Sequence, residues 1–415
     1  MFTFALDAIR TAGGHAPSAF MVFFAYVWAL WSLKALAARR YRPSDALTGT
    51  LSVSVLVPVY KEPEEIFRRV LASVKAETPF ELIAIVDGGD PDVAAVARDY
   101  ADQVLRVPKA GKRAAIAAGL AASDPSTGVV VVLDSDTIWM PGALTEMLRP
   151  FADPRVGGVT PRQAIFDVGN DPVRRLADWI EDLRYLLTVP AQSVFGQVGC
   201  LAGRTIAYRR VAFEPAVAAL VRQTVFGVQQ HVGDDRVLTN ELLRAGWRTV
   251  YQSTAVVHTD APPDWRTFWR QQLRWGRSSQ RETLLSLRWL WRRPVAFITF
   301  SADIVTPFAL YALVLFAAAQ SLAGGTGRTA LPLAAELVLA YAGMVLGIGI
   351  RQIAHFRRRP SDLVRLPLFV LQLTFVMVPI RILAFATMLH QSWSTRPVST
   401  TPEFLPEPAL SQSAG

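Results

Sequence analysis

Residues Gly128–Asp136 read GVVVVLDSD, a short apolar run that ends in two aspartates. A run this short and this rich in valine predicts a buried β-strand. Asp134 and Asp136 lie two residues apart in an extended segment, so both side chains can face the same way. Carboxylate oxygens are ligands that Mg²⁺ and Mn²⁺ prefer. We therefore predict a divalent-metal site at the carboxyl end of this strand, with coordination positions left for a substrate's pyrophosphate.

The segments on the N-terminal side of this strand repeat the same alternation. Apolar runs lie at 52–60, 81–89 and 103–108, and helical patterns lie at 64–74 and 94–101. Apolar strands that alternate with helices are typical of a parallel sheet covered by helices on both faces. Such sheets bind ligands at the carboxyl ends of their strands. We therefore predict one α/β domain with a mostly parallel sheet and a binding site at that edge.

Polar residues follow two more of these strands. Tyr60 and Glu62 come after the first strand, and Asp87 ends the second directly before two glycines. A strand-end aspartate is also a common turn former or helix cap, so the residues alone leave both interpretations of Asp87 open. Lys112, in the AGKR segment at 110–113, begins a helical pattern. Backbone N–H groups and the lysine amine can contact an anion there.

A later acidic pair opens another helical pattern. Asp234 and Asp235 belong to the GDDR segment at 233–236. One interpretation is a helix cap, which the helix dipole favours. The other is a general base, because repulsion between adjacent carboxylates raises the pKa of one of them. The residues alone leave both interpretations open.

Several other classes of site are unsupported by the sequence. No G-x-x-x-x-G-K-[ST] motif occurs, and no G-x-G-x-x-G follows the first strand, which argues against a P-loop and a dinucleotide oxidoreductase. One cysteine and five scattered histidines argue against a zinc site. The net charge is +9, but much of it flanks apolar segments. This indicates a lipid bilayer, rather than nucleic acid, as the partner.

Four apolar stretches are long enough, or nearly so, to cross a membrane; they are 20–36, 295–322, 331–350 and 366–389. A secretory signal is the alternative for the first, but no small-residue cleavage site follows it. Basic residues collect beside one end of the spans, so the positive-inside rule predicts that residues 39–293 lie in the cytoplasm. A single cysteine suits that reducing compartment.

The apolar stretches and the basic residues beside them also predict the domain boundaries. In order, they are an N-terminal membrane anchor at 1–42, a cytoplasmic domain at 43–262, interfacial amphipathic helices at 263–293, three membrane helices at 294–390 and a disordered tail at 391–415. We therefore expect a multi-pass protein of the cell membrane whose α/β domain faces the cytoplasm.

The predicted interfacial segment contains WRQQLRWGRS at Trp269–Ser278. On a helix, Gln271, Arg274 and Trp275 fall at i, i+3 and i+4 and share one face. The other tryptophan and the other arginines suit a position at headgroup depth; they are Trp269, Arg270, Arg277 and Arg281. A purely interfacial helix without functional side chains is the alternative.

Charged residues also lie inside the predicted spans, where they are expensive and often functional. Glu336 and Arg381 lie at similar depth, so we expect them to pair, and we expect Asp303 to face a water-filled path. Packing or snorkelling without a transport role is the alternative. Pro379, close to Arg381, is expected to kink the last span.

Taken in chain order, the short motifs resemble those of one family. They are PVYKE at 58–62, DGG at 87–89, GKR at 111–113, DSD at 134–136, GDDR at 233–236 and QQLRW at 271–275. The set is similar to that of the membrane-integrated, processive family 2 glycosyltransferases, which include hyaluronan, chitin, chitooligosaccharide and cellulose synthases. The similarity is dense over residues 50–290. It implies a Rossmann-like, glycosyltransferase A-type fold and a nucleotide-sugar donor.

The resemblance implies a role for each matching position. The donor would be held by Tyr60, Glu62, Asp87, Lys112, Asp134, Asp136 and Gln271. Asp134 and Asp136 would also bind Mg²⁺ or Mn²⁺ on the donor's diphosphate. Asp235, with Asp234 beside it, would be the base that deprotonates the acceptor hydroxyl. Arg274 would contact the diphosphate, and Trp275 would offer a flat surface to the acceptor sugar.

The chain departs from the family at Cys200–Thr205, which reads CLAGRT. The synthases have a cysteine- or serine-glycine-proline segment there, beside the acceptor. Arg204 stands at the place of that proline, so Gly203 and Arg204 are predicted to border the acceptor. Because of this difference, the identity of the acceptor and of the product stays open. Cys200 either borders the site or is a small buried thiol.

The expected function is inverting transfer of a sugar from UDP-GlcNAc, UDP-Glc or UDP-GlcA to a growing β-linked polysaccharide or oligosaccharide, coupled to export. A transferase that makes a glycolipid or a polyprenyl-phosphate sugar is the nearest alternative. A non-catalytic transporter or nucleotide-sensing receptor is the alternative from another class. The expected partners are a carbohydrate acceptor, the lipid bilayer and either a second protomer or an export partner. The sugar, its linkage and the product length stay open.

Overall fold

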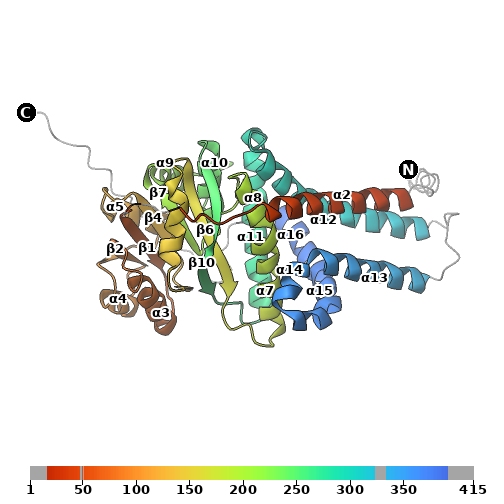
Figure 1. Ribbon diagram of the computed structural model, residues 1–415, viewed down its shortest axis with the longest axis horizontal. Helices are drawn as coiled ribbons and strands as arrows, with labels where there is room; N and C mark the ends of the chain where they lie inside the picture. Colours follow the sequence, from red (N-terminus) through yellow and green to blue (C-terminus); the bar gives the residue numbers. More distant parts are fainter. Residues whose placement is uncertain (1–15, 47–48, 50, 323–332, 391–415) are drawn as a thin grey trace, which may run out of the picture.

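The computed structural model describes residues 16–46, 49, 51–322 and 333–390. It consists of an α/β domain and a group of helices, three of which (α2, Ala16–Arg39; α12, Pro294–Leu322; α13, Leu333–Arg351) project from one end of that domain (Figure 1). The tail predicted to be disordered lies outside the described residues.

One sheet of eight strands organises the α/β domain, in the order β3-β2-β1-β4-β7-β6-β10-β5. The strands are β1 (Val53–Val59), β2 (Glu81–Asp87), β3 (Gln103–Val107), β4 (Val129–Leu133), β5 (Thr137–Trp139), β6 (Val156–Ile165), β7 (Thr205–Arg209) and β10 (Arg248–Thr259). The prediction of an α/β domain with a mostly parallel sheet is confirmed. Strands β7 and β5 are the exceptions, because each runs antiparallel to its neighbours.

Helices cover both faces of the sheet. They are α3 (Glu64–Lys75), α4 (Pro91–Arg98), α5 (Lys112–Ala122), α6 (Ala143–Leu148), α7 (Pro172–Leu183), α8 (Val189–Val194), α9 (Arg210–Arg222) and α10 (Asp234–Arg244). The two short strands β8 (Thr224–Val225) and β9 (Val228–Gln229) form a separate hairpin. Alternate residues of β1 point to opposite faces. Val55 therefore belongs to the same hydrophobic cluster as Phe67 of α3, and Leu56 belongs to the cluster on the other face, with Ile116 of α5 and Phe213 of α9.

The carboxyl ends of β1, β2 and β4 meet at one edge of the sheet. Strand β1 is central and pairs in parallel with both neighbours, with Leu56 opposite Ile83 on one side and Val132 on the other. Helix α5 lies close to these strands, since a Cβ on Gly119 would sit 2.8 Å from Cδ1 of Ile85. The three loops that follow these strands are therefore held next to the start of α5.

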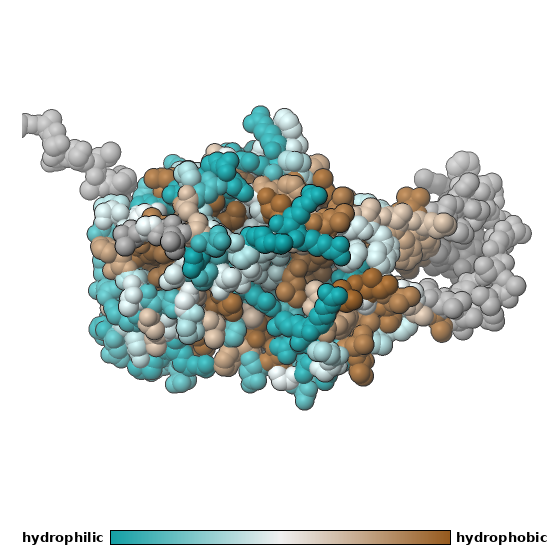
Figure 2. All heavy atoms as spheres, in the orientation of Figure 1, coloured by the Kyte–Doolittle hydropathy of each residue, from teal (hydrophilic) through white to brown (hydrophobic). Residues whose placement is uncertain are grey.

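Three described helical segments are long and apolar enough to cross a membrane: Phe20–Arg39, Pro294–Phe316 and Pro360–Ala386. The third predicted span, at 331–350, coincides with α13, whose described part includes the shorter apolar stretch Tyr341–Arg351. On the face drawn in Figure 2, hydrophilic residues cover much of the α/β domain, and hydrophobic residues gather toward the projecting helices.

The last predicted span is not one regular helix. Predicted at 366–389, it contains α15 (Leu366–Gln372), the π turn η5 (Leu373–Met377) and α16 (Val378–Ala386). The short helix α14 (Ile353–Arg358) and the 3₁₀ turn η4 (Pro360–Arg365) precede it. Pro379 lacks an N–H to donate, and its ring would clash with the carbonyl four residues earlier, inside η5. The wider π turn relieves that clash. A second π turn, η3 (Arg184–Thr188), precedes Pro190 of α8 in the same way.

The predicted interfacial segment is a single helix, α11 (Trp265–Leu290), and not several. It packs against α16 so closely that a Cβ on Gly276 would lie 2.8 Å from the Cβ of Ala384. The prediction for Arg281 is wrong, because this side chain is buried, pairs with Glu282 at 3.2 Å and donates to the carbonyl of Val232. Helix α11 therefore joins the α/β domain to the apolar helices.

Candidate active site

One cavity of about 3780 Å³ begins at the carboxyl edge of the sheet and continues between α2, α12, α13 and α16. All of the predicted site residues line it; they are Tyr60, Glu62, Asp87, Lys112, Asp134, Asp136, Gly203, Arg204, Asp234, Asp235, Gln271, Arg274 and Trp275. The cavity is larger than a small-molecule pocket of roughly 300–1,000 Å³. It therefore has room for an extended ligand.

Asp87, at the end of β2, organises one end of the cavity. Its carboxylate accepts hydrogen bonds from the backbone N–H groups of Ala110 (2.8 Å) and Gly111 (3.1 Å). Burial raises the pKa of Asp87, although these two donors oppose the shift. Gly88 adopts a φ of 83° beside the ring of Tyr60. This end of the cavity therefore offers an aromatic ring next to a carboxylate held by the loop before α5.

Lys112, at the start of α5, forms ion pairs with residues of two other elements. The sequence did not predict these pairs. Its Nζ lies 2.6 Å from Oδ1 of Asp134, after β4, and 3.0 Å from Oδ2 of Asp234, at the start of α10. Burial alone would lower the pKa of Lys112, but the charges of the two aspartates outweigh it and raise that pKa. The lysine therefore stays charged and holds the acidic residues of two motifs together.

Asp136 and Glu62 bring more negative charge to the same place. Ser135 donates a hydrogen bond to Oε2 of Glu62 at 2.7 Å, and Thr137 donates to Oδ1 of Asp136 at 3.2 Å. Burial, and then the charge of Glu62, raise the pKa of Asp136. A hard divalent cation would neutralise this excess charge, and carboxylate oxygens are the ligands it prefers. Asp134 and Asp136 therefore fit the predicted Mg²⁺ or Mn²⁺ site.

Asp235 lies next to this group, on the first turn of α10. It accepts hydrogen bonds from the backbone N–H groups of Arg236 (2.7 Å) and Gly203 (3.3 Å), and the sulfur of Cys200 lies 3.8 Å from its Oδ2. Burial, and then the charge of Asp234, raise the pKa of Asp235. A half-buried carboxylate with a raised pKa that borders a cavity is suited to act as a general base.

Arg204 and Trp275 form a wall close to Asp235. The guanidinium of Arg204 donates to Oε1 of Glu181 at 2.8 Å and to Gln163 at 3.3 Å, and it lies 5.5 Å from the ring of Trp275. Helix α7, which carries Glu181, contains no recognisable motif, so sequence reasoning missed this residue. Its neighbour Arg184 was also missed.

Helix α11 brings Gln271, Arg274 and Trp275 to the cavity together. Burial lowers the pKa of Arg274, and the nearby charges of Asp234 and Asp134 oppose that shift. A guanidinium stays protonated in proteins, so Arg274 places a positive charge beside the acidic group. This arrangement provides oxygen ligands for a cation and a planar set of donors for a phosphate.

Two of the three charged residues predicted inside the spans line the cavity. Asp303 and Arg381 both line it. The side chain of Glu336 lies outside the described residues, so its predicted pairing with Arg381 stays a prediction.

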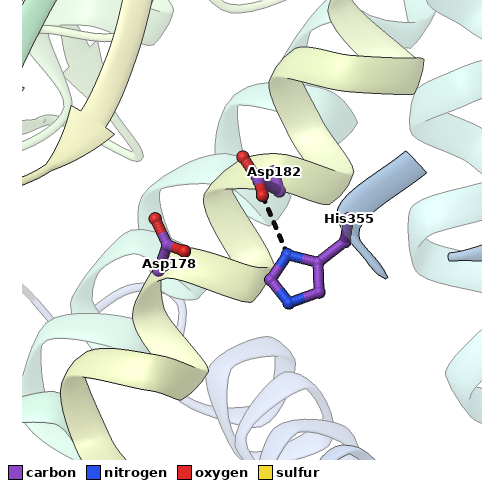
Figure 3. Close-up of side chains that lie close together, drawn as sticks. All are labelled: Asp178, Asp182 and His355. Carbon is purple, nitrogen blue, oxygen red and sulfur yellow. Dashed lines mark hydrogen bonds and ion pairs between the residues drawn. The ribbon is translucent and has the colours of Figure 1, made fainter. Parts of the chain in front are cut away.

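A second acidic cluster lies outside this cavity. Asp178, Asp182 and His355 place one potential ligand atom each within 4.8 Å of one another, and Figure 3 shows them between α7 and the start of α14. Arg358 donates to Asp182 at 2.7 Å and to Asp178 at 2.8 Å, and Arg359 donates to Asp178 at 2.6 Å. Because arginines already neutralise these carboxylates, we interpret the cluster as an ion-pair network rather than a metal site.

We expect Asp178→Asn to lower the free energy of unfolding by about 1–3 kcal/mol, because it removes the carboxylate that pairs with Arg359 and one of the two that pair with Arg358. A fully buried pair would lose about 3–5 kcal/mol, but the two arginines are 30% and 28% exposed. Thermal unfolding in detergent measures the effect. Asp99→Asn, which breaks an exposed pair with Arg68, should change it by less than about 1 kcal/mol. Stabilisation of the unmodified protein by Zn²⁺, lost in Asp178→Asn, would contradict the interpretation.

Comparisons with known proteins agree with this geometry. The family model described as glycosyltransferase like family 2 matches residues 51–278. A hyaluronan synthase of Streptococcus pyogenes is 28% identical over 370 residues, which cover 86% of each chain. An N-acetylglucosaminyltransferase of Azorhizobium caulinodans is 30% identical over 85% of this chain and 89% of its own. One of Mesorhizobium japonicum is 30% identical over 86% of each.

The matched region contains the whole sheet and the helix that carries Arg274 up to Ser278. It covers more than half of the 415 residues. The similarity to the relatives covers 85–86% of this chain, which is more than the family model matches. The chain belongs to glycosyltransferase family 2, and its relatives include hyaluronan synthases and N-acetylglucosaminyltransferases.

Proposed function

We propose that this protein is an inverting glycosyltransferase that moves a sugar from a UDP-sugar to the end of a growing β-linked polysaccharide or oligosaccharide. UDP-GlcNAc, UDP-Glc and UDP-GlcA are the candidate donors. One observation carries the proposal: the acidic group, Asp235 and the Arg274 helix line a single cavity that continues between the apolar helices. Such a cavity suits an enzyme whose product remains bound while it is extended.

In the proposed reaction, Asp235 accepts the proton of the attacking acceptor hydroxyl. The hydroxyl oxygen bonds to the anomeric carbon as the bond from that carbon to the diphosphate oxygen breaks. A single displacement of this kind turns an α-linked donor into a β-linked product. Negative charge develops on the departing UDP, where Arg274 and Lys112 are placed to stabilise it. Trp275 supports the acceptor sugar by packing against its face.

Asp134 and Asp136 would hold Mg²⁺ or Mn²⁺ in this scheme. When bound, the ion supplies charge neutralisation for the leaving diphosphate. Tyr60, Glu62 and Asp87 would hold the uracil and ribose at the other end of the donor, and Gln271 would contact the donor from α11. These assignments follow from the resemblance, and the shared cavity supports them.

The proposed location is the cell membrane, with the α/β domain on the cytoplasmic side. Arg39 ends the first candidate span and Arg40 follows it, and three arginines precede the last span, at 357–359. These basic ends support that orientation. The cavity between the apolar helices would then lead the product outward. A second protomer or an export partner would complete a path that these helices enclose only in part.

Release of UDP tests the proposal. We expect purified protein in lipid nanodiscs to release UDP from at least one of the three candidate donors when Mg²⁺ or Mn²⁺ is present. Removing the ion with a chelator should lower the rate at least about 100-fold, since charge stabilisation of the leaving group is worth several kcal/mol. Adding the ion back should restore the rate. Absence of release from every donor, with the fold intact, would refute the proposal.

A water-soluble product would support chain synthesis over transfer to a lipid. Digestion by linkage-specific hydrolases would then identify the sugar and the bond. A product extracted only into organic solvent would instead favour the glycolipid alternative.

A further inference from the structure

The carboxylate of Asp235 is held by backbone groups from two parts of the chain. The N–H of Arg236, next to it on α10, donates to Oδ1 at 2.7 Å. The N–H of Gly203 donates to Oδ2 at 3.3 Å, and Gly203 ends an irregular segment at 199–203. The orientation of the proposed base therefore depends on where the 199–203 segment lies.

The side chain of Arg236 fastens the other end of this segment. Its guanidinium donates to the carbonyl of Gly199 at 2.8 Å and to Oγ1 of Thr283, on α11, at 3.2 Å. Arg236 is only 2% exposed, and its Nε has no hydrogen-bond partner among the described residues. Burial lowers the pKa of Arg236 to about 10, because the nearby acidic groups oppose the shift without cancelling it. The charged guanidinium is therefore poorly solvated, and a partner on its flat face would stabilise it.

The ring of Phe300, on α12, provides that partner. Its centre lies 3.3 Å from Cζ of Arg236, so the guanidinium rests on the face of the ring. The attraction between a cation and an aromatic ring is strongest where water is excluded, and Phe300 is 6% exposed. The tip of the ring also packs directly on the 199–203 segment, since a Cβ on Gly199 would overlap it.

The start of α12 is attached to the same part of the α/β domain. The side-chain oxygen of Gln197 accepts from the N–H groups of Val295 (3.1 Å) and Ala296 (3.4 Å), which have no partner inside the helix. Gln197 lies two residues before the 199–203 segment, so this segment and α12 are held in a fixed position relative to each other. Phe300 lies in the candidate membrane span Pro294–Phe316. The contact therefore connects an apolar helix to the loop that orients Asp235.

We infer that Phe300 is a positioning residue, through which the apolar helix α12 keeps the proposed base Asp235 in its reactive orientation. The inference rests on the proposed function and goes beyond it, because no part of the reaction has been assigned to α12. The ring supports the guanidinium of Arg236, which holds the carbonyl of Gly199. The N–H of Gly203, at the other end of the segment, then stays within hydrogen-bond distance of Asp235.

Variants of Phe300 in the full-length protein, in lipid nanodiscs, give the first test. We expect Phe300→Ala to lower kcat about 10–100-fold, because even a small displacement of a reacting group is that costly. The dissociation constant of UDP should stay nearly unchanged. Phe300→Leu fills much of the same space but lacks the aromatic face, so its kcat should lie between those of Phe300→Ala and the unmodified protein. A loss of UDP affinity as large as the loss of kcat would overturn the inference, because it would indicate a structural role.

Phe308→Ala is the matched control. Phe308 lies two turns further along α12, packs against Phe385 and does not line the cavity. This variant removes a ring of the same size from the same helix, so we expect its kcat to stay close to that of the unmodified protein. An equal loss in Phe308→Ala would overturn the inference, because any large side chain on α12 would then matter as much.

A double-mutant cycle with Asp235→Asn separates positioning from a general loss of structure. Asp235→Asn lacks the base, so the orientation of this side chain no longer limits its rate. We expect Phe300→Ala to change the residual kcat of Asp235→Asn by less than about twofold. Prolonged incubation with a radiolabelled donor measures that residual rate. Equal losses in the two backgrounds would overturn the inference, because Phe300 would then support the fold or contact the acceptor itself.

Should Phe300→Ala fail to fold, Phe300→Leu takes its place in the same cycle. We then expect a loss of kcat beside the unmodified Asp235 and no further loss in Asp235→Asn. Equal kcat values for Phe300→Leu and the unmodified protein would overturn the inference, because the aromatic face would then have no role. Absence of UDP release by the unmodified protein would instead refute the proposed function.

Discussion

Asp235→Asn is expected to lower the rate of sugar transfer about 10²–10⁴-fold and to leave UDP binding nearly unchanged. Asparagine has almost the same shape, and its carbonyl oxygen can still accept the hydrogen bond that Arg236 donates to Asp235 at 2.7 Å. It cannot take a proton from the acceptor hydroxyl, so the loss should fall on kcat. Steady-state kinetics measure kcat, and calorimetric titration with UDP measures the dissociation constant.

The raised pKa of Asp235 adds a second observable. The base acts when it is deprotonated, so kcat/KM should fall as the pH drops through this pKa, which lies above the ordinary aspartate value. Asp92→Asn, an exposed position on α4, is the matched control and should leave both the rate and the pH profile as they are. Full activity in Asp235→Asn would show that another group takes the proton.

Arg274→Lys is expected to lower kcat about 10²-fold, the size of the effect when one preorganised donor to a developing oxyanion is removed. Lysine keeps the charge but loses the planar pair of donors that fits a diphosphate. Arg274 lies among the charges of Asp234, Asp134 and Asp235. Changing the shape of this side chain should therefore weaken the stabilisation of the transition state. Rates at saturating donor and acceptor measure the effect.

Arg270→Lys, one turn earlier on the same helix, is the matched control. Arg270 is half-buried but does not line the described cavity, and lysine keeps its charge. We therefore expect the kcat of Arg270→Lys to stay within about twofold of the unmodified protein. Equal losses in the two variants would mean that α11 needs its arginines for packing or lipid contact. The role of Arg274 in the reaction would then be wrong.

The α/β fold was predictable because its strands repeat one pattern. Apolar runs that end in polar residues predicted β1, β2 and β4, and their parallel pairing follows from the helices between them. The place of β7 was not predictable. It lies antiparallel between β4 and β6, and the residues TIAYR carry no information on direction or partner.

The candidate site was predictable to the extent that its residues lie at strand ends or helix starts. Asp87, Asp134 and Asp136 meet because neighbouring parallel strands end at one edge. The pairing of Lys112 with Asp234 was missed, since residues more than a hundred positions apart approach only because α5 and α10 both pack against α9. Glu181, on α7, and Arg184, at the start of η3, were missed because α7 and the turn that follows it carry no motif. Arg281 was predicted to lie at the lipid interface, but α11 buries it against the α/β domain.

A structure of the protein with UDP and Mn²⁺ bound is the measurement that tests the central claim, namely that acidic strand ends and the arginine of α11 act on one diphosphate. The account predicts the diphosphate between Asp136 and Arg274, with Mn²⁺ located by its anomalous scattering on the carboxylates of Asp134 and Asp136. Asp235 should stay accessible from the acceptor side of the cavity. UDP bound outside this cavity, or Mn²⁺ bound at Asp178 and Asp182, would contradict the account.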